Sequence, residues 1–118
     1  MSSHLQALER RIAKATGQDR DLDRAIADTI DRDARDDTVL GYTSSVDTCL
    51  ALIGAVLPDW HWHVGHGPSG ILPYASLSKT TGPDDEMPLR VEASAATVPV
   101  ALLHAMVKAL IADRRARG

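Results

Sequence analysis

The sequence predicts an α+β fold in which helices pack, sandwich-like, against a three-stranded antiparallel sheet, in the order α-α-α-β-β-β-α. Apolar residues recur every three or four positions, the period of a helix, over residues 5–30, 44–57 and 97–111. Apolar and polar residues alternate, as in half-buried strands, over residues 60–65, 71–79 and 89–95. Loops rich in Gly and Pro separate these strands, and short reversals favour antiparallel pairing.

Composition indicates one soluble domain. The 118 residues are 44% hydrophobic but contain no Phe, so Leu, Val, Ile and Ala must build the core, and Trp60 and Trp62 carry much of the large apolar surface. The net charge of −3 argues against binding nucleic acid through bulk electrostatics. Cys49 is the only cysteine, which suits a reducing cytoplasm, and the start "MSSHLQALERR" lacks the layout of a signal peptide.

Two short helices are expected before the main core. The apolar stripe of the first is Leu5, Leu8 and Ile12, and that of the second is Leu22, Ile26 and Ile30. Gly17 can end the first helix, and Asp19 or Asp21 can cap the second. Such narrow stripes are typical of helices on the surface of a fold.

The charged run "DRDARDDT" at residues 31–38 follows these helices. It lacks the Gly and the final Glu of an EF-hand loop, so a solvated linker is favoured over a calcium site. We therefore expect peripheral helices and linker at 1–38 and an α-β-β-β-α core at 39–118, within a single domain overall.

The core helix is predicted to begin at a capping box of Ser44 and Asp47 and to end before Pro58. Its apolar face is Val46, Cys49, Leu50, Ile53 and Leu57. Cys49 could in principle be a nucleophile, but no base accompanies it, so the pattern favours a small buried apolar residue.

The strands are predicted to have one dry and one wet face. The dry face would hold Trp60, Trp62, Val64, Leu89, Val91 and Ala93, packed against the core helix and the last helix. Burying each Trp there would contribute on the order of 2–3 kcal/mol. The wet face would hold His61, His63, Arg90, Glu92 and Ser94.

The last helix is the most strongly patterned element. Thr97 and Pro99 suit its first turn, and its broad apolar face is Leu102, Leu103, Met106, Val107, Leu110 and Ile111. Arg114, Arg115 and Arg117 follow at the carboxyl end, where the helix dipole favours positive charge.

The wet sheet face is the candidate binding surface, with His61, His63, Arg90 and Glu92 as its site residues. The amino-terminal helices could cover it, a second chain could share it, or a partner could bind it. Metal binding is the alternative: His61 and His63 point the same way, and His66 and Glu92 could complete a site. The alternation of Trp and His along the strand explains the positions of these histidines without a metal. No HExxH or cysteine signature supports a metal site either, so no metal or other cofactor is expected.

The core order is also that of double-stranded-RNA-binding domains, and "GHGP" stands where those domains have a loop with Gly and Pro. Those domains hold phosphates with lysines at the start of the last helix. Here that segment is Thr97-Val98-Pro99-Val100-Ala101, which cannot neutralise a phosphate. A dsRNA-binding-like module is therefore only a second alternative.

A closer likeness lies in "YTSSVDTCLALIGAVLPDWHW" and "VEASAATVPVALLHAMVKAL". The sequence resembles the phage ABA sandwich domain family of small proteins encoded by phages and prophages, over residues 19–112. The resemblance rests on Tyr42, Ser45, Asp47, Trp60, Trp62, Ala95-Ala96-Thr97 and Ala101-Leu102. It departs mildly where the usual Pro-Ala-Leu reads Pro99-Val100-Ala101-Leu102.

These motifs are structural, so the resemblance implies fold and origin and carries over no catalytic residue. It implies a phage or prophage accessory protein in the cytoplasm of a bacterial host. With no catalytic signature present, we expect a non-enzymatic protein that binds a host or phage protein, and inhibition of a host defence complex is one specific version. A metal-binding protein or hydrolase using His61, His63 and His66 is the alternative. Because three strands leave unpaired edges, we also expect a homodimer.

Overall fold

The computed structural model describes residues 2–30, 41–66, 73–79 and 89–117. Its elements are α1 (Ser2–Lys14), α2 (Arg20–Thr29), α3 (Val46–Val56), β1 (His61–His66), β2 (Pro73–Lys79), β3 (Leu89–Ser94) and α4 (Val98–Arg117). The α+β fold and the order α-α-α-β-β-β-α are as the sequence predicts.

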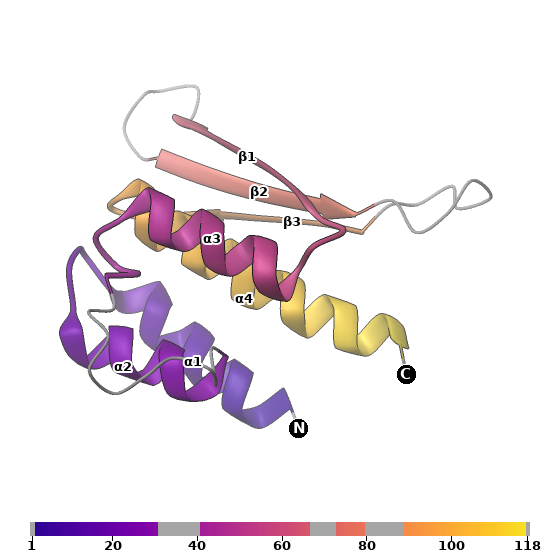
Figure 1. The fold of residues 1–118 in the computed structure, drawn as a ribbon, viewed down its shortest axis with the longest axis horizontal. Coiled ribbons are helices and arrows are strands. Elements are labelled where there is room, and N and C mark those ends of the chain that lie inside the picture. Colours follow the sequence, from indigo (N-terminus) through magenta and orange to yellow (C-terminus); the bar gives the residue numbers. More distant parts are fainter. Residues whose placement is uncertain (1, 31–40, 67–72, 80–88, 118) are drawn as a thin grey trace.

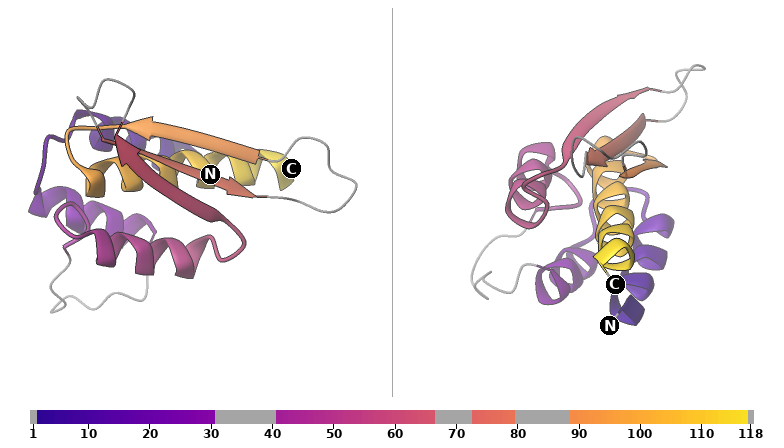
Figure 2. Two further views of the ribbon diagram at one scale, coloured as in Figure 1. Left: turned by 90° about the horizontal axis from the view of Figure 1, so that it is seen from above. Right: turned by 90° about the vertical axis from the view of Figure 1, so that its right-hand side faces the viewer.

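Helix α4 is the centre of the molecule (Figure 1). It contacts all three strands on one side, α1 on the other and α3 along its flank, while α2 packs on α1. In the right-hand view of Figure 2 the sheet lies above α4. Helices α3 and α1 lie on opposite sides of α4, and α2 lies below α3. The packing is therefore layered, with one face of the sheet against α4.

Burial on several sides explains the composition of α4. Its fully buried residues are Val100, Ala101, Leu102, Leu103, Ala105, Met106, Val107 and Ala109. A helix with apolar residues around most of its circumference is typical of an element enclosed by others. The small residues among them let neighbouring backbones approach closely.

The sheet has the order β1-β2-β3, and both pairs are antiparallel. Cross-strand partners lie on one face, so the register forms rows that run across the sheet. The rows that face α4 include Trp62–Leu77–Val91 and Val64–Ala75–Ala93, and the Lys79–Leu89 pair lies on the same side. Ala75, Leu77 and Ala93 are buried there, and the burial of Ala93 confirms the prediction for the third strand.

Capping residues fix where the helices begin. The Asp19 side chain accepts a hydrogen bond from the Leu22 N–H at the start of α2, as predicted. For α3 the predicted cap is wrong by one residue: Ser45, not Ser44, accepts from the Thr48 N–H. The Ser44 hydroxyl instead donates to the Gly41 carbonyl in the preceding turn.

The packing of α3 also differs from the prediction. Within the described residues, the backbone of α3 approaches α4 and none of the strands, so α3 does not cover the sheet. Because α4 lies mainly under β2 and β3, β1 is left with little cover. Trp60, just before β1, is only 6% exposed, but Trp62 on the α4-facing side of β1 is 49% exposed. The expectation that Trp62 is buried is therefore wrong.

The amino-terminal helices bury the predicted stripes except for Ile30, which is only partly buried, and within the described residues their backbones do not approach the strands. Leu5, Leu8, Ile12, Leu22 and Ile26 are buried, and α1 packs on α4. The predicted linker at 31–38 lies outside the described residues, as do the side chains of Arg114, Arg115 and Arg117.

Candidate functional site

The candidate site is the sheet face turned away from α4, which we call the open sheet face. Three register rows form it: His61–Ser78–Arg90, His63–Ser76–Glu92 and Gly65–Tyr74–Ser94. No helix of the described chain lies on this side of the sheet, as Figures 1 and 2 show. All four predicted site residues, His61, His63, Arg90 and Glu92, lie on this face and are exposed.

The charges on this face are arranged along β3. The Arg90 guanidinium lies 3.6 Å from the Glu92 carboxylate, and their side chains are 66% and 54% exposed. Solvent screens a pair as exposed as this, so it contributes little to stability. Both groups therefore remain available to charges on another molecule.

Tyr74 also lies on the open sheet face, although it is not among the predicted site residues. Its ring covers Gly65, the residue opposite it on β1: a Cβ placed on Gly65 would lie 3.2 Å from a ring carbon and 3.3 Å from the hydroxyl oxygen. The ring centroid also lies 6.0 Å from that of His63, in a tilted arrangement. The alternation of Tyr74 with buried Ala75 and Leu77 could have placed it here.

The metal alternative depends on bringing a third ligand to His61 and His63. Glu92 shares a row with His63, two strands away. His66 is the last residue of β1 and pairs with Pro73, and its side chain lies outside the described residues. In the described part of the chain, no group of three or more His, Cys, Asp or Glu residues could hold a metal ion.

A second polar cluster lies where α2 meets the turn before α3. The buried Asp23 carboxylate accepts a 2.8 Å hydrogen bond from the Thr43 N–H, and the Thr43 hydroxyl accepts a 2.8 Å bond from the Asp19 N–H. These bonds join residues 20 and 24 positions apart, and in each of them a side chain accepts from a backbone N–H of the same chain. The cluster therefore positions α2 and does not form a ligand site.

Cys49 lies beside this cluster and is fully buried, as predicted. Its thiol donates to the Tyr42 carbonyl, with Sγ and O 2.9 Å apart. Burial, and then the negative charge of Asp23, raises the pKa of the thiol to about 12. At neutral pH the thiol stays protonated and is a poor nucleophile.

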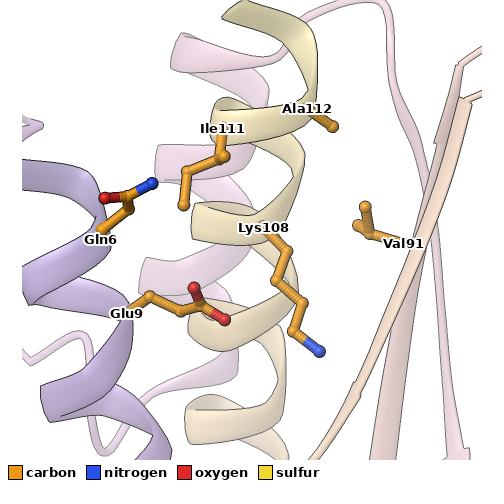
Figure 3. Close-up of a pocket in the computed structure, with 6 residues that line it drawn as sticks. All are labelled: Gln6, Glu9, Val91, Lys108, Ile111 and Ala112. Atoms are coloured by element: carbon orange, nitrogen blue, oxygen red, sulfur yellow. The ribbon is translucent and has the colours of Figure 1, made fainter. Parts of the chain in front are cut away.

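A cavity of about 310 Å³ lies between α1, α4 and β3. Figure 3 shows its apolar side chains, Val91, Ile111 and Ala112, with the polar side chains of Gln6, Glu9 and Lys108 around them. Glu9 lies 3.1 Å from His104 on α4, and the Lys108 ammonium donates to the Glu92 carbonyl at 3.0 Å. These contacts already engage both charged side chains in joining α1 and β3 to α4.

None of the described helices is long and apolar enough to cross a membrane. Comparison with family models, with curated proteins and with solved structures gave no match. The resemblance to the phage ABA sandwich domain therefore stays a prediction.

Proposed function

We propose that this protein is a small non-enzymatic binding protein that holds a protein partner against its open sheet face. The observation that carries the proposal is that this face has no covering element in the described chain, while α4 packs against β2 and β3 on the opposite face. One-sided cover of an antiparallel sheet is common. Here the uncovered face carries an aromatic ring and both signs of charge in addition to small polar residues.

The three rows suggest the chemistry of the partner. Arg90, with His61 in its row, suits a carboxylate, and Glu92 in the next row suits a Lys or Arg. Tyr74, lying over Gly65, offers an aromatic surface for an apolar or aromatic side chain. A surface with both charge signs and an aromatic residue fits another folded protein better than it fits a phosphate backbone.

The resemblance to phage ABA sandwich proteins supports a phage or prophage origin, which makes the expected partner a protein of the bacterial host or of the phage. Small binding proteins without catalytic residues act by covering a surface of their target. We therefore propose occlusion of a host protein, with a host defence complex as the specific candidate.

The test is a charge exchange within the Arg90–Glu92 pair. The double variant Arg90→Glu, Glu92→Arg keeps the net charge and an ion pair on β3 but reverses the charge that each row presents. A pull-down from host lysate should recover a discrete partner with the wild type, and the exchange should weaken its capture at least tenfold.

The matched control is the same exchange in the exposed Arg24–Asp28 pair on α2, whose groups lie 3.3 Å apart on the far side of α4 from the sheet. This control should capture the partner as the wild type does. Equal capture by both exchanged variants, or no partner above background with the wild type, would contradict the proposal.

A further inference from the structure

The two edges of the sheet present backbone groups that can be assigned from the register. Ala95 N–H donates to the Pro73 carbonyl beyond the Tyr74–Ser94 pair, so Tyr74 and Ser94 form a non-hydrogen-bonded pair. The backbone groups of Tyr74 and Ser76 therefore point to β1, where they meet Gly65 and His63. It follows that the N–H and C=O groups of Trp62, Val64 and His66 point away from the sheet along β1, and those of Arg90, Glu92 and Ser94 do so along β3.

The outer edge of β3 is protected against further pairing. The Lys108 ammonium donates to the outward Glu92 carbonyl at 3.0 Å. The same edge carries the charged side chains of Arg90 and Glu92 on its open face. Lysine and other charges at an edge strand are a common means of preventing strand addition.

Within the described residues, the outer edge of β1 has no such protection. The strand His61–His66 contains no Lys, Arg, Asp, Glu or Pro, and within the described chain its outer side has no neighbouring strand. Trp62 on this strand is the one large apolar side chain of the described residues that is exposed. An unprotected edge beside an exposed Trp indicates a surface that becomes covered by another strand.

We propose that the strand that covers this edge is β1 of a second copy of the chain, paired antiparallel about a two-fold axis at Val64. The pairing would give a continuous sheet with three strands from each copy and would extend the open sheet face across both. This inference goes beyond the proposed function, because it concerns the edge of β1 and not the face that would hold a partner.

Two features select the second copy and the register. The absence of Lys, Arg, Asp and Glu from β1 means that two copies of it meet without bringing such charges together. With the axis at Val64, every outward residue of β1 has a hydrogen-bonding partner, and His63 lies opposite Gly65 of the second copy. Moving the axis to His63 would leave fewer outward residues paired and would set the two His63 rings directly opposite each other.

Sedimentation equilibrium at high micromolar concentration is the first test. The wild type should have twice the 12.7 kDa mass of one chain, and Val64→Pro should reduce it to one chain. Proline at Val64 removes an N–H that points outward, so the β1–β2 hydrogen bonds remain. Ser94→Pro is the matched control, since it removes an outward N–H from the edge of β3, and it should stay a dimer.

A monomeric wild type would overturn the proposal, and so would a folded Val64→Pro variant that stays dimeric. Loss of the dimer in both proline variants would overturn it as well, because the edge of β3 would then be involved. Circular dichroism checks that each variant is folded.

If Val64→Pro fails to fold, disulfide cross-linking tests the proposed pairing of β1 with β1 of a second copy. In the proposed register the two Val64 Cα atoms are about 5.5 Å apart, within reach of a disulfide. The two Trp62 positions are four residues apart along the strands, about 13 Å. Under mild oxidation Val64→Cys should form a covalent dimer and Trp62→Cys should not, while native Cys49 is buried. No cross-link at Val64→Cys, or equal cross-linking at both positions, would overturn the register.

The two proposals can fail separately. The exchange Arg90→Glu, Glu92→Arg should leave the sedimenting mass unchanged, because neither side chain lies on β1. A dimer that captures no partner would refute only the proposed function, and a monomer that captures one would refute only the pairing of β1.

Discussion

Trp60 and Trp62 stand two residues apart in the chain, and their surroundings differ. Trp60 is 6% exposed and belongs to the core, while Trp62 is 49% exposed on a strand that α4 barely reaches. Removing apolar surface from water stabilises the fold more when the side chain is more buried. The destabilising cavity left by removing a side chain is likewise larger at a buried position. The two residues should therefore contribute very differently to stability.

We expect Trp60→Ala to lower the free energy of unfolding by about 3–5 kcal/mol and Trp62→Ala by about 1 kcal/mol. Urea denaturation at low concentration, where self-association does not contribute, measures both. Each variant is the control for the other, because the two substitutions remove the same atoms. Equal losses would show that Trp62 is buried in the monomer.

Cys49 gives a prediction of pH dependence. Burial, and then the Asp23 carboxylate, raises the pKa of its thiol from 9.0 to about 12. Above pH 9 the thiol of the unfolded chain ionises while that of the folded chain does not, so the unfolded state binds fewer protons. This contribution to stability is complete below pH 9 and is lost as the pH rises toward 12.

The free energy of unfolding should therefore fall above pH 9, by at most about 1.4 kcal/mol per pH unit from this group. Denaturation at a series of pH values measures the slope, and Cys49→Ala should reduce it. Native Cys49 should also react with thiol reagents at pH 8 far more slowly than it does in denaturant. Identical slopes for the wild type and Cys49→Ala would contradict the buried, protonated thiol.

Among the elements, α2 is fixed by specific polar contacts and not only by its apolar stripe. Asp23 is 3% exposed, and its carboxylate accepts a hydrogen bond from the N–H of Thr43, a residue that is also buried. Removing an acceptor leaves a buried donor without its partner, which costs more than the hydrogen bond contributed.

Asp23→Ala should accordingly lower the free energy of unfolding by about 1–3 kcal/mol. The control is Asp28→Ala on the same helix, whose exposed pair with Arg24 contributes roughly 0.3–0.5 kcal/mol. Chemical denaturation compares the two variants. Asp23→Ala should also lower the pKa of Cys49, because it removes one of the causes of the raised value. Similar losses in the two variants would contradict a structural role for Asp23.

For the whole molecule, the arrangement of layers makes α4 dependent on α1. Helix α1 contacts α4 along its buried side, and Glu9 on α1 lies 3.1 Å from His104 on α4. Without α1, apolar residues of α4 that are now fully buried would meet water.

Removal of residues 1–38 should therefore convert cooperative thermal unfolding into a gradual transition and increase binding of the dye ANS, as in a molten globule. Calorimetry and ANS fluorescence measure these effects, with the full chain as the control. A truncated chain that unfolds cooperatively and binds no ANS would show that residues 39–118 fold independently.

The sequence by itself determined the secondary structure and which residues share a face. Periods of 3.6 and 2 residues are local properties, so the spacing of Leu5, Leu8 and Ile12 predicted α1, and the alternation in 89–95 placed Arg90 and Glu92 on one side of β3. The cap of α3 was missed because Ser44 and Ser45 both suit it, and only backbone geometry selects Ser45.

Only the tertiary structure decided how well each face is covered. The alternation of β1 assigned Trp62 to the α4-facing side correctly but could not show that α3 packs beside α4 and leaves that strand exposed. Likewise, the sequence could not show that α1 and α2 leave the open sheet face uncovered. Burial depends on contacts between residues far apart in the chain, and no periodicity within a segment records which distant element will cover it.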